Sequence, residues 1–287
     1  MGGWKGVRMR IVVTGGNGKL GRAVVAHLKD LGNEVFVFDR VAAREPGYFP
    51  VDLTDYGQVV DAMLGIEENH SGVDALVHLA AIPAPGMFPD VSTFRNNMLS
   101  SYHVLQAARR AGVHRIVTAS SETVLGLPFE VPPPYLPVDE EYDARPESTY
   151  SLVKHLEEQM EIQLCRWDPK LSITAMRFSN VMNPEDYAQF RDFQADANLR
   201  RWNLWGYIDT RDAADAIAKA LEVRGPGFER LIIANADTVM ERPSTELAAE
   251  VFPDVPLKRP LEGNETLLSI DKARRLLGWE PQHSWRD

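Results

Sequence analysis

The stretch Ile11-Val12-Val13-Thr14-Gly15-Gly16-Asn17-Gly18-Lys19-Leu20-Gly21 decides the fold, because an apolar run leads directly into spaced glycines. The apolar run predicts a buried strand, and residues 19–31 repeat apolar side chains at helical spacing. Gly15, Gly18 and Gly21 allow, in turn, a tight turn, a close approach of the backbone to a pyrophosphate and close packing of the helix on the strand. The free N–H groups at the start of such a helix favour a phosphate. We therefore predict a dinucleotide site made by Gly15, Asn17, Gly18, Lys19, Leu20 and Gly21.

The rest of the chain continues the alternation of strands and helices. Apolar runs predict strands over 34–39, 75–80, 114–120, 171–178 and 230–234, and helical periodicity predicts helices over 56–64, 97–111, 150–165 and 212–223. Continuous apolar strands separated by helices indicate an α/β fold with a Rossmann-type, doubly wound parallel sheet. After Asn180 the alternation weakens. We expect a dinucleotide-binding domain over 1–180 and 207–234, and a small interleaved substrate lobe over 181–206 and 235–287.

Composition limits the classes of partner. Hydrophobic residues make up 44% of the 287 residues, enough for a large core, and the net charge is −10. An acidic chain without a basic cluster argues against a nucleic-acid partner. No apolar stretch reaches the length of a membrane span, and no metal site is expected. The single cysteine, Cys165, fits a reducing compartment, so we expect a cytoplasmic protein.

The end of the second predicted strand bears on the choice of cofactor. Asp39 is placed to accept hydrogen bonds from ribose hydroxyls and to repel a 2′-phosphate, which favours NAD. Arg40 keeps NADP open as an alternative, since an arginine there can hold that phosphate. Asp52-Leu53 is expected near the adenine, with a helix-capping role for Asp52 or Thr54 as the alternative. The small residues of Leu79-Ala80-Ala81 leave room for the cofactor at the end of the next strand.

Several further motifs occur in a fixed order along almost the whole chain. With the glycine loop, the chain resembles the extended short-chain dehydrogenase/reductases, also called the NAD-dependent epimerase/dehydratase family. The motifs are His78-Leu79-Ala80-Ala81, Asn97, Ser120-Ser121, Tyr150-Ser151-Leu152-Val153-Lys154, Arg177-Phe178-Ser179-Asn180-Val181, Tyr207-Ile208-Asp209 and Leu277-Gly278-Trp279-Glu280-Pro281.

Tyr150 and Lys154 are four residues apart on a predicted helix and therefore share a face. A nearby ammonium favours the phenolate, so Tyr150 can exchange a proton with a substrate hydroxyl while hydride moves to or from the nicotinamide. The resemblance implies that Lys154 also binds the nicotinamide ribose and that Ser121 bonds the reacting oxygen. It also implies that Asn97 helps to hold Lys154 through water.

The sequence indicates the class of substrate less directly than it indicates the cofactor. Residues 183–205 form a short, acidic segment, which points away from a sugar nucleotide and towards a small sugar, sugar acid or polyol. The chain is also similar to the uronate dehydrogenases, in which an arginine at the position of Arg200 holds a carboxylate. A surface ion pair with Asp196 is the alternative for Arg200. Glu122, directly after Ser121, departs from that pattern, and Ser121, Glu122, Asn180 and Arg200 are the expected substrate-binding residues.

Three functions remain open on these grounds. The first is a dehydrogenase that oxidises a small sugar, sugar acid or polyol with NAD. The second is an epimerase or dehydratase that retains its cofactor, in which Glu122 would act as an acid. The third is a non-catalytic dinucleotide sensor, disfavoured because Ser121, Tyr150 and Lys154 are all present. A homodimer is expected through the helices that hold Asn97 and Tyr150.

Overall fold

The computed structural model describes residues 8–41, 45–65, 72–223 and 225–287; the first seven residues of the expected dinucleotide-binding domain lie outside these ranges. Within them the chain forms a seven-stranded sheet of order β3-β2-β1-β4-β5-β6-β9, and every pair of neighbouring strands is parallel. The strands are β1 (Arg10–Thr14), β2 (Glu34–Asp39), β3 (Tyr48–Pro50), β4 (Ala75–His78), β5 (Arg115–Ser121), β6 (Ser172–Phe178) and β9 (Gly227–Ile233).

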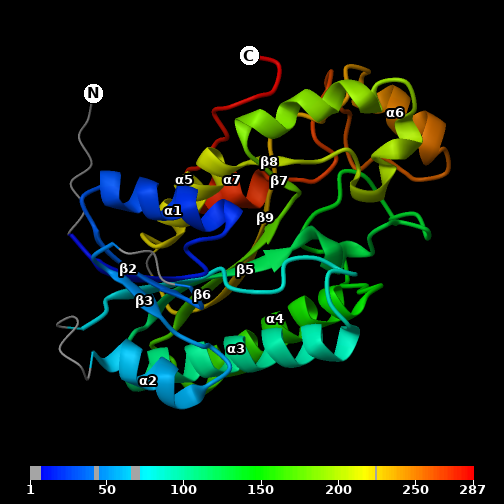
Figure 1. Cartoon of the computed structure of the whole chain (residues 1–287). Coiled ribbons are helices and arrows are strands. Elements are labelled where there is room, and N and C mark those ends of the chain that lie inside the picture. Colours follow the sequence, from blue (N-terminus) through cyan, green and yellow to red (C-terminus); the bar gives the residue numbers. More distant parts are fainter. Residues whose placement is uncertain (1–7, 42–44, 66–71, 224) are drawn as a thin grey trace.

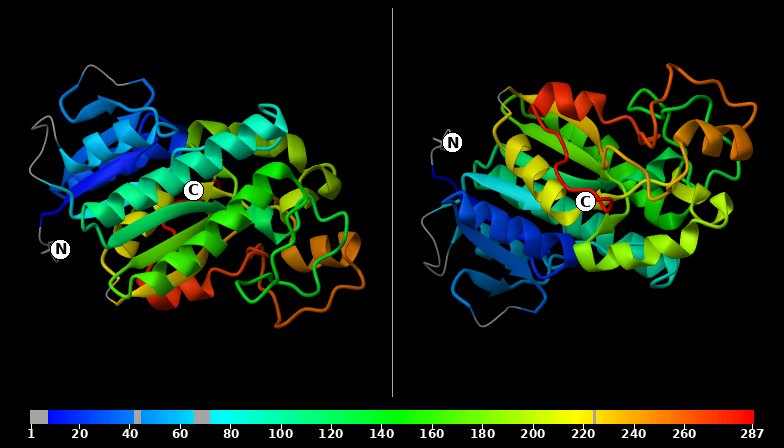
Figure 2. Two further views of the ribbon diagram at one scale, coloured as in Figure 1. Left: turned by 90° about the horizontal axis from the view of Figure 1, so that it is seen from below. Right: turned by 90° about the horizontal axis from the view of Figure 1, so that it is seen from above.

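Helices cover both faces of the sheet, as Figures 1 and 2 show. One layer contains α2 (Tyr56–Leu64), α3 (Asp90–Arg110) and α4 (Thr149–Trp167), and the other contains α1 (Lys19–Asp30), α5 (Thr210–Ala220) and α7 (Asp271–Leu277). Side chains alternate across a strand, so Val12 packs in the cluster that includes Val104 and Leu105 of α3, while Ile11 and Val13 join the cluster of α1 and α5. The predicted doubly wound sheet is confirmed.

A smaller group of elements lies beyond the carboxyl ends of the strands, at the upper right of Figure 1. It contains the two-stranded sheet of β7 (Val181–Met182) and β8 (Ile208–Asp209), the 3-10 turns η2 (Pro184–Phe193), η3 (Ala197–Leu199) and η4 (Arg201–Asn203), and α6 (Ser244–Val251). The proline-rich loop over residues 128–146 joins this group. In it, Leu136 and Val138 form bridges with Leu257 and Leu268. The expected division into two domains stays a prediction.

The structure differs from the sequence expectations at several boundaries. The short strand β3 was not expected, because three residues that end in a proline carry little strand signal. Helix α3 begins at Asp90, after Pro89, seven residues before the expected start. The sequence did not predict these first turns because they expose Val91 and Phe94 to solvent and show no apolar periodicity. The turn η1 (Glu122–Leu125), directly after β5, was also not expected. No helix within the described ranges is both long and apolar enough to cross a bilayer.

Candidate active site

A cavity of about 1110 Å³ opens at the carboxyl ends of β1, β4, β5 and β6. The strand order reverses between β1 and β4, which is where ligands bind in open α/β sheets. Most of the residues expected at the site line this cavity. They are Gly15, Asn17, Gly18, Lys19, Leu20, Gly21, Asp39, Arg40, Leu53, Leu79, Ala80, Ala81, Ser121, Glu122, Tyr150, Lys154 and Asn180.

The glycine loop has the geometry of a phosphate cradle. Gly15 has φ +71°, and a Cβ atom there would lie 2.8 Å from the Ala80 backbone, so only glycine fits. Gly18 caps α1 without any side-chain hydrogen bond, which leaves the first N–H groups of the helix directed at the cavity. At Gly21 a Cβ atom would collide with the Gly15 oxygen and with Gly16. Gly21 therefore packs α1 against the loop itself.

Asp39 and Arg40 lie at one end of the cavity. The Asp39 carboxylate accepts hydrogen bonds from the backbone N–H groups of Asn17 (3.1 Å) and Arg40 (2.8 Å), which fixes its orientation beside the glycine loop. The Arg40 guanidinium instead donates to Asn96 of α3, with 2.7 Å between Nη2 and Oδ1. The Asp39 carboxylate is therefore held in one orientation, at the position where the ribose hydroxyls are expected.

Asp52 lies outside the lining residues of the described chain. Its carboxylate accepts two hydrogen bonds from Thr54, through the backbone N–H at 2.9 Å and the hydroxyl at 2.7 Å, and these bonds lower its pKa. The capping residue of α2 is Asp55 rather than Asp52 or Thr54, because its side chain accepts from Gly57 and Gln58. Of the expected pair, Leu53 alone lines the cavity.

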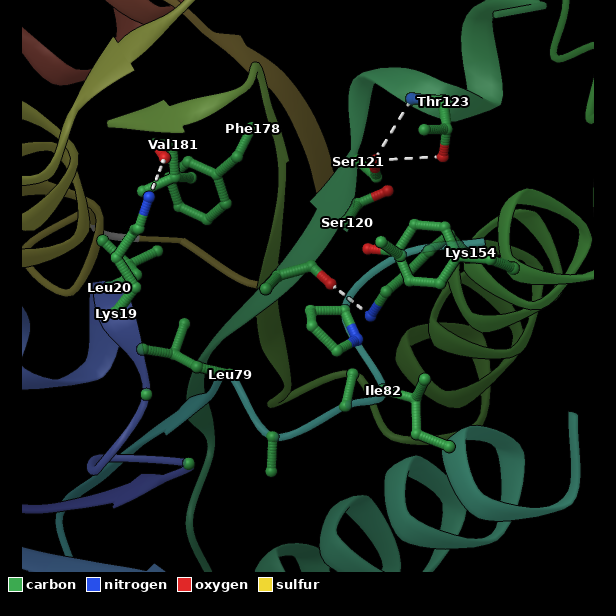
Figure 3. A pocket seen from close by; sticks show the side chains of 18 of the residues that line it. Lys19, Leu20, Leu79, Ile82, Ser120, Ser121, Thr123, Lys154, Phe178 and Val181 are labelled. Carbon is green, nitrogen blue, oxygen red and sulfur yellow. Dashed lines mark hydrogen bonds between the residues drawn. The ribbon is translucent and has the colours of Figure 1, made fainter. Parts of the chain in front are cut away.

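Ser121 and Tyr150 come together at the middle of the cavity. Ser121 ends β5, and its oxygen accepts from the Thr123 N–H (3.2 Å) and hydroxyl (3.0 Å), as Figure 3 shows. Both bonds use the oxygen as acceptor, so the Ser121 proton can be donated to Tyr150 or to a bound oxygen. Tyr150 is buried in the first turn of α4, where burial raises its phenol pKa while Lys154 and a hydrogen bond with Ser121 oppose the rise.

Lys154 lies one helical turn after Tyr150 and is 4% exposed. Its ammonium donates to the Ala119 carbonyl oxygen at 2.7 Å (Figure 3) and to Glu157 at 2.9 Å. Burial lowers its pKa, but the interactions with Glu157, Tyr150 and Glu161 together outweigh this and the net direction is upward. The pair is therefore a charged lysine next to a phenol, as the spacing predicts.

Asn97 is bound to the loop that follows β4. Its amide is bound to the backbone of Ile82, accepting from the Ile82 N–H at 2.8 Å and donating to the Ile82 oxygen at 3.1 Å. Ile82 follows the Leu79–Ala81 segment and itself lines the cavity. Asn97 thus fixes the loop after β4, and its expected water-mediated contact with Lys154 stays a prediction.

Glu122 is the buried carboxylate of the site, at 3% exposure. Ser179 donates to it at 2.6 Å and Asn203 at 3.1 Å. Burial raises its pKa to about 7, against the effect of these bonds and of nearby Arg200. A carboxyl with this pKa can hold or release a proton near neutral pH.

Arg200 does not line the cavity within the described chain. Its guanidinium lies 5.1 Å from the centre of the Phe193 ring and 5.0 Å from that of Trp202, and it donates to the Gly206 oxygen at 3.0 Å. Burial lowers its pKa to about 10. The alternative expectation for Arg200 was a surface ion pair with Asp196. Arg200 is instead buried, at 4% exposure, and the described residues show no such ion pair. Trp202, which does line the cavity, stands beside the guanidinium.

Sequence reasoning missed several lining residues. Trp202, Leu127 and Pro128 close the end of the cavity beyond Ser121, and Glu147 lies at the same end. Leu127 and Pro128 lie in a loop with no periodic signal, so only the three-dimensional structure places them. Ser179 had a signal, because it belongs to a motif whose neighbour Asn180 was expected at the site.

The comparisons with known proteins agree with this geometry. Residues 11–234 match the family described as the NAD dependent epimerase/dehydratase family. A curated relative is the UDP-glucose 4-epimerase of Bacillus subtilis, 23% identical over 97% of this chain and 96% of that protein. Among solved structures, a UDP-galactose 4-epimerase is 29% identical, with a TM-score of 0.69 over 96% of this chain and 94% of that chain. A mutated uronate dehydrogenase is 24% identical, with a TM-score of 0.70 over 98% and 84%.

Proposed function

This chain belongs to the NAD-dependent epimerase/dehydratase family, and we propose that within it the protein acts as a dehydrogenase on a hydroxyl group of a small sugar or polyol. NAD is the cofactor of the family, as the sequence predicts. The finer assignment to a dehydrogenase is our proposal, and it is supported by the chemistry of the residues around the cavity.

The residues at the glycine-loop end fit NAD. The N–H groups at the start of α1 would bind the pyrophosphate, Asp39 the adenine ribose and Lys154 the nicotinamide ribose. The small side chains of Ala80 and Ala81, which line the cavity beside the glycine loop, leave room for the cofactor. Bound there, NAD supplies a hydride acceptor for the carbon that carries the substrate hydroxyl.

The residues at the middle of the cavity supply the proton transfer. Tyr150 would take the proton of the substrate hydroxyl as the C–H bond breaks, so that an alcohol becomes a carbonyl. The charge of Lys154 stabilises the phenolate form of Tyr150, and the free proton of Ser121 orients the reacting oxygen.

The observation that carries the substrate class is the charge at the far end of the cavity. Among the described lining residues outside the glycine loop and the Asp39–Arg40 pair, two are carboxylic acids, Glu122 and Glu147, and Lys154 is the one cation. A diphosphate needs cationic side chains or clustered N–H donors. This end is therefore better suited to neutral hydroxyl groups, which can donate to Glu122, than to a sugar nucleotide.

A sugar acid ranks below a neutral sugar for the same reason. Arg200, the residue expected to hold a carboxylate, stands behind Trp202 and beside Glu122. Its Nε atom has no hydrogen-bond partner in the described part of the chain. A carboxylate would reach this arginine only if Trp202 turned aside.

A second candidate is an epimerase or dehydratase that returns the hydride to its product. Two observations favour it: Glu122 holds a proton near neutral pH, and the curated relative from Bacillus subtilis is a UDP-glucose 4-epimerase. Such an enzyme keeps its cofactor and shows no net reduction of added NAD.

The two functions are separated by nicotinamide absorbance. The protein is incubated with NAD and a panel of aldoses, polyols and uronic acids, and separately with UDP-sugars under analysis of the sugar product. Net NADH from a neutral sugar supports the dehydrogenase. Epimerised UDP-sugar without net NADH supports the second candidate.

A further inference from the structure

A continuous row of buried polar side chains leads from β1 to the active-site lysine. It runs through Thr14, His78, Ser101 and Glu157 to Lys154, and none of these residues is more than 5% exposed. They come from β1, β4, α3 and α4, so the row crosses the sheet and two helices. Buried polar groups are costly unless they are bonded, so this row requires an explanation.

From Thr14 to Glu157, each residue of the row donates a hydrogen bond to the next. Ser101 donates to Glu157 at 2.5 Å, so His78 Nε2, 3.0 Å from the Ser101 oxygen, is the donor of that pair. His78 Nδ1 then accepts from the Thr14 hydroxyl at 2.7 Å. Burial lowers the His78 pKa to about 3, so its ring is neutral and carries the one N–H that this scheme requires.

The row therefore ends at the Glu157 carboxylate, which accepts hydrogen bonds from two sides. Ser101 donates to one Glu157 oxygen and the Lys154 ammonium donates to the other, at 2.9 Å. An ammonium buried without a counter-ion favours its neutral form, and a carboxylate at hydrogen-bond distance reverses that preference. Among the described residues, Glu157 is the carboxylate that accepts a hydrogen bond from Lys154, since the other acceptor, the Ala119 carbonyl, is uncharged.

We propose that Glu157 is a positioning residue, which holds Lys154 in place and keeps it protonated beside Tyr150, while the Thr14–His78–Ser101 row holds the Glu157 carboxylate in position. The inference rests on the proposed roles of Tyr150 and Lys154. It assigns Glu157 no contact with substrate or cofactor, since it acts through Lys154. One end of the row also meets the cofactor end of the cavity, because Thr14 precedes Gly15 and accepts from the Ala80 N–H at 3.4 Å.

Other ionisable groups surround the pair, and they do not replace Glu157. Glu158 is bound to Arg177 at 2.7 Å and is engaged there. Burial and the charge of Glu157 raise the pKa of Glu161 well above its usual range. Among the described residues, the ionisable groups that act on Lys154 or Glu157 are Tyr150 and Glu161 of α4 and His78 of β4. Glu122 of η1 acts on Tyr150, and Arg177 of β6 and Arg230 of β9 act on Glu158.

The test is the titration of Lys154 itself, followed by NMR on protein with isotope-labelled lysine, with the Lys154 signal assigned from the K154R variant. In E157Q we expect the Lys154 pKa to fall by about one unit or more. E185Q is the control, since it removes an exposed carboxylate of η2, outside α4, and its Lys154 titration should equal that of the wild type. E157D, which retains the charge, should restore most of the shift.

A folded E157Q protein whose Lys154 titrates at the wild-type pH would overturn the proposal. If E157Q fails to fold, E157M takes its place, since it has a similar length and no charge, and it should lower the Lys154 pKa in the same way; an unchanged pKa in a folded E157M protein would also overturn the proposal. The titration needs neither turnover nor substrate. A failure of the proposed dehydrogenase function, seen as an absence of NADH formation, is thus distinguished from a failure of this inference.

Discussion

Lys19 Nζ lies 2.7 Å from Asp186 Oδ2 and 3.2 Å from the Val181 carbonyl oxygen, so the glycine loop is tied to the segment that follows β7. Lys19 and Val181 both line the cavity (Figure 3), and Asp186 lies in η2. The tie therefore passes beside the place where the pyrophosphate is expected. A cofactor that leaves the cavity has to pass this connection or part it.

The first prediction concerns the rate at which NADH leaves. We expect D186N to raise that rate up to about fivefold, because a half-exposed ion pair contributes about 0.2–1 kcal/mol. Stopped-flow fluorescence of bound NADH measures the rate, and high salt should reduce the difference. The neighbouring variant E185Q serves as control. Equal rates for D186N and the wild type at low salt would show that the tie does not hold the cofactor.

The second prediction concerns cofactor choice. D39N removes the charge that repels a 2′-phosphate and leaves a side chain of the same size, whose one amide oxygen can still accept from one of the two N–H groups, that of Asn17 or that of Arg40. We expect the ratio of the dissociation constants for NADPH and NADH to fall by about tenfold, or ~1.4 kcal/mol. Fluorescence titration with each nucleotide gives the ratio. If it stays at the wild-type value, Asp39 does not set the preference.

The third prediction concerns Tyr150. Y150F removes the hydroxyl that transfers the proton, so turnover should fall by about 10²–10⁴-fold. NADH affinity should stay within about twofold, because general acid–base chemistry is lost without loss of the binding loop. Parallel turnover and fluorescence measurements check both. Loss of NADH binding together with a lower melting temperature would instead assign Tyr150 to packing.

Much of this site could be predicted because its motifs are local in sequence. The glycine loop and the pair Tyr150–Lys154 are fixed by spacing along one turn or one helix. Glu157 is also visible at helical spacing from Lys154, but its importance comes from burial against Ser101 of α3, and the sequence does not show which α3 residue faces it.

Other parts depend on contacts between distant segments. Arg200 was expected to face substrate, but the rings of Phe193 and Trp202 hold its guanidinium. The bonds from Ser179 and Asn203 that hold Glu122 join three separate segments. The expected homodimer and cytoplasmic location stay predictions.

The fourth prediction concerns stability and pH. The folded-state pKa of Glu122 is raised to about 7, so the folded protein binds its proton more tightly than the unfolded chain does. The associated stability is present at low pH and is lost as pH rises towards 7, by up to about 3 kcal/mol. E122Q, which cannot ionise, should lose less stability than the wild type between pH 5 and 8. Denaturant unfolding at pH 5 and at pH 8 measures the loss of stability, with the exposed Glu147 changed to Gln as control. An equal loss in E122Q and in the wild type would contradict the prediction.

The dehydrogenase assignment is tested by nicotinamide absorbance with NAD and a panel of neutral aldoses and polyols, alongside uronic acids. We predict NADH formation from at least one neutral sugar or polyol, its loss in Y150F, and weaker reaction with the corresponding uronic acid. Tight binding of NAD without NADH formation from any member of the panel, together with conversion of a UDP-sugar, would contradict the dehydrogenase assignment and establish the epimerase in its place.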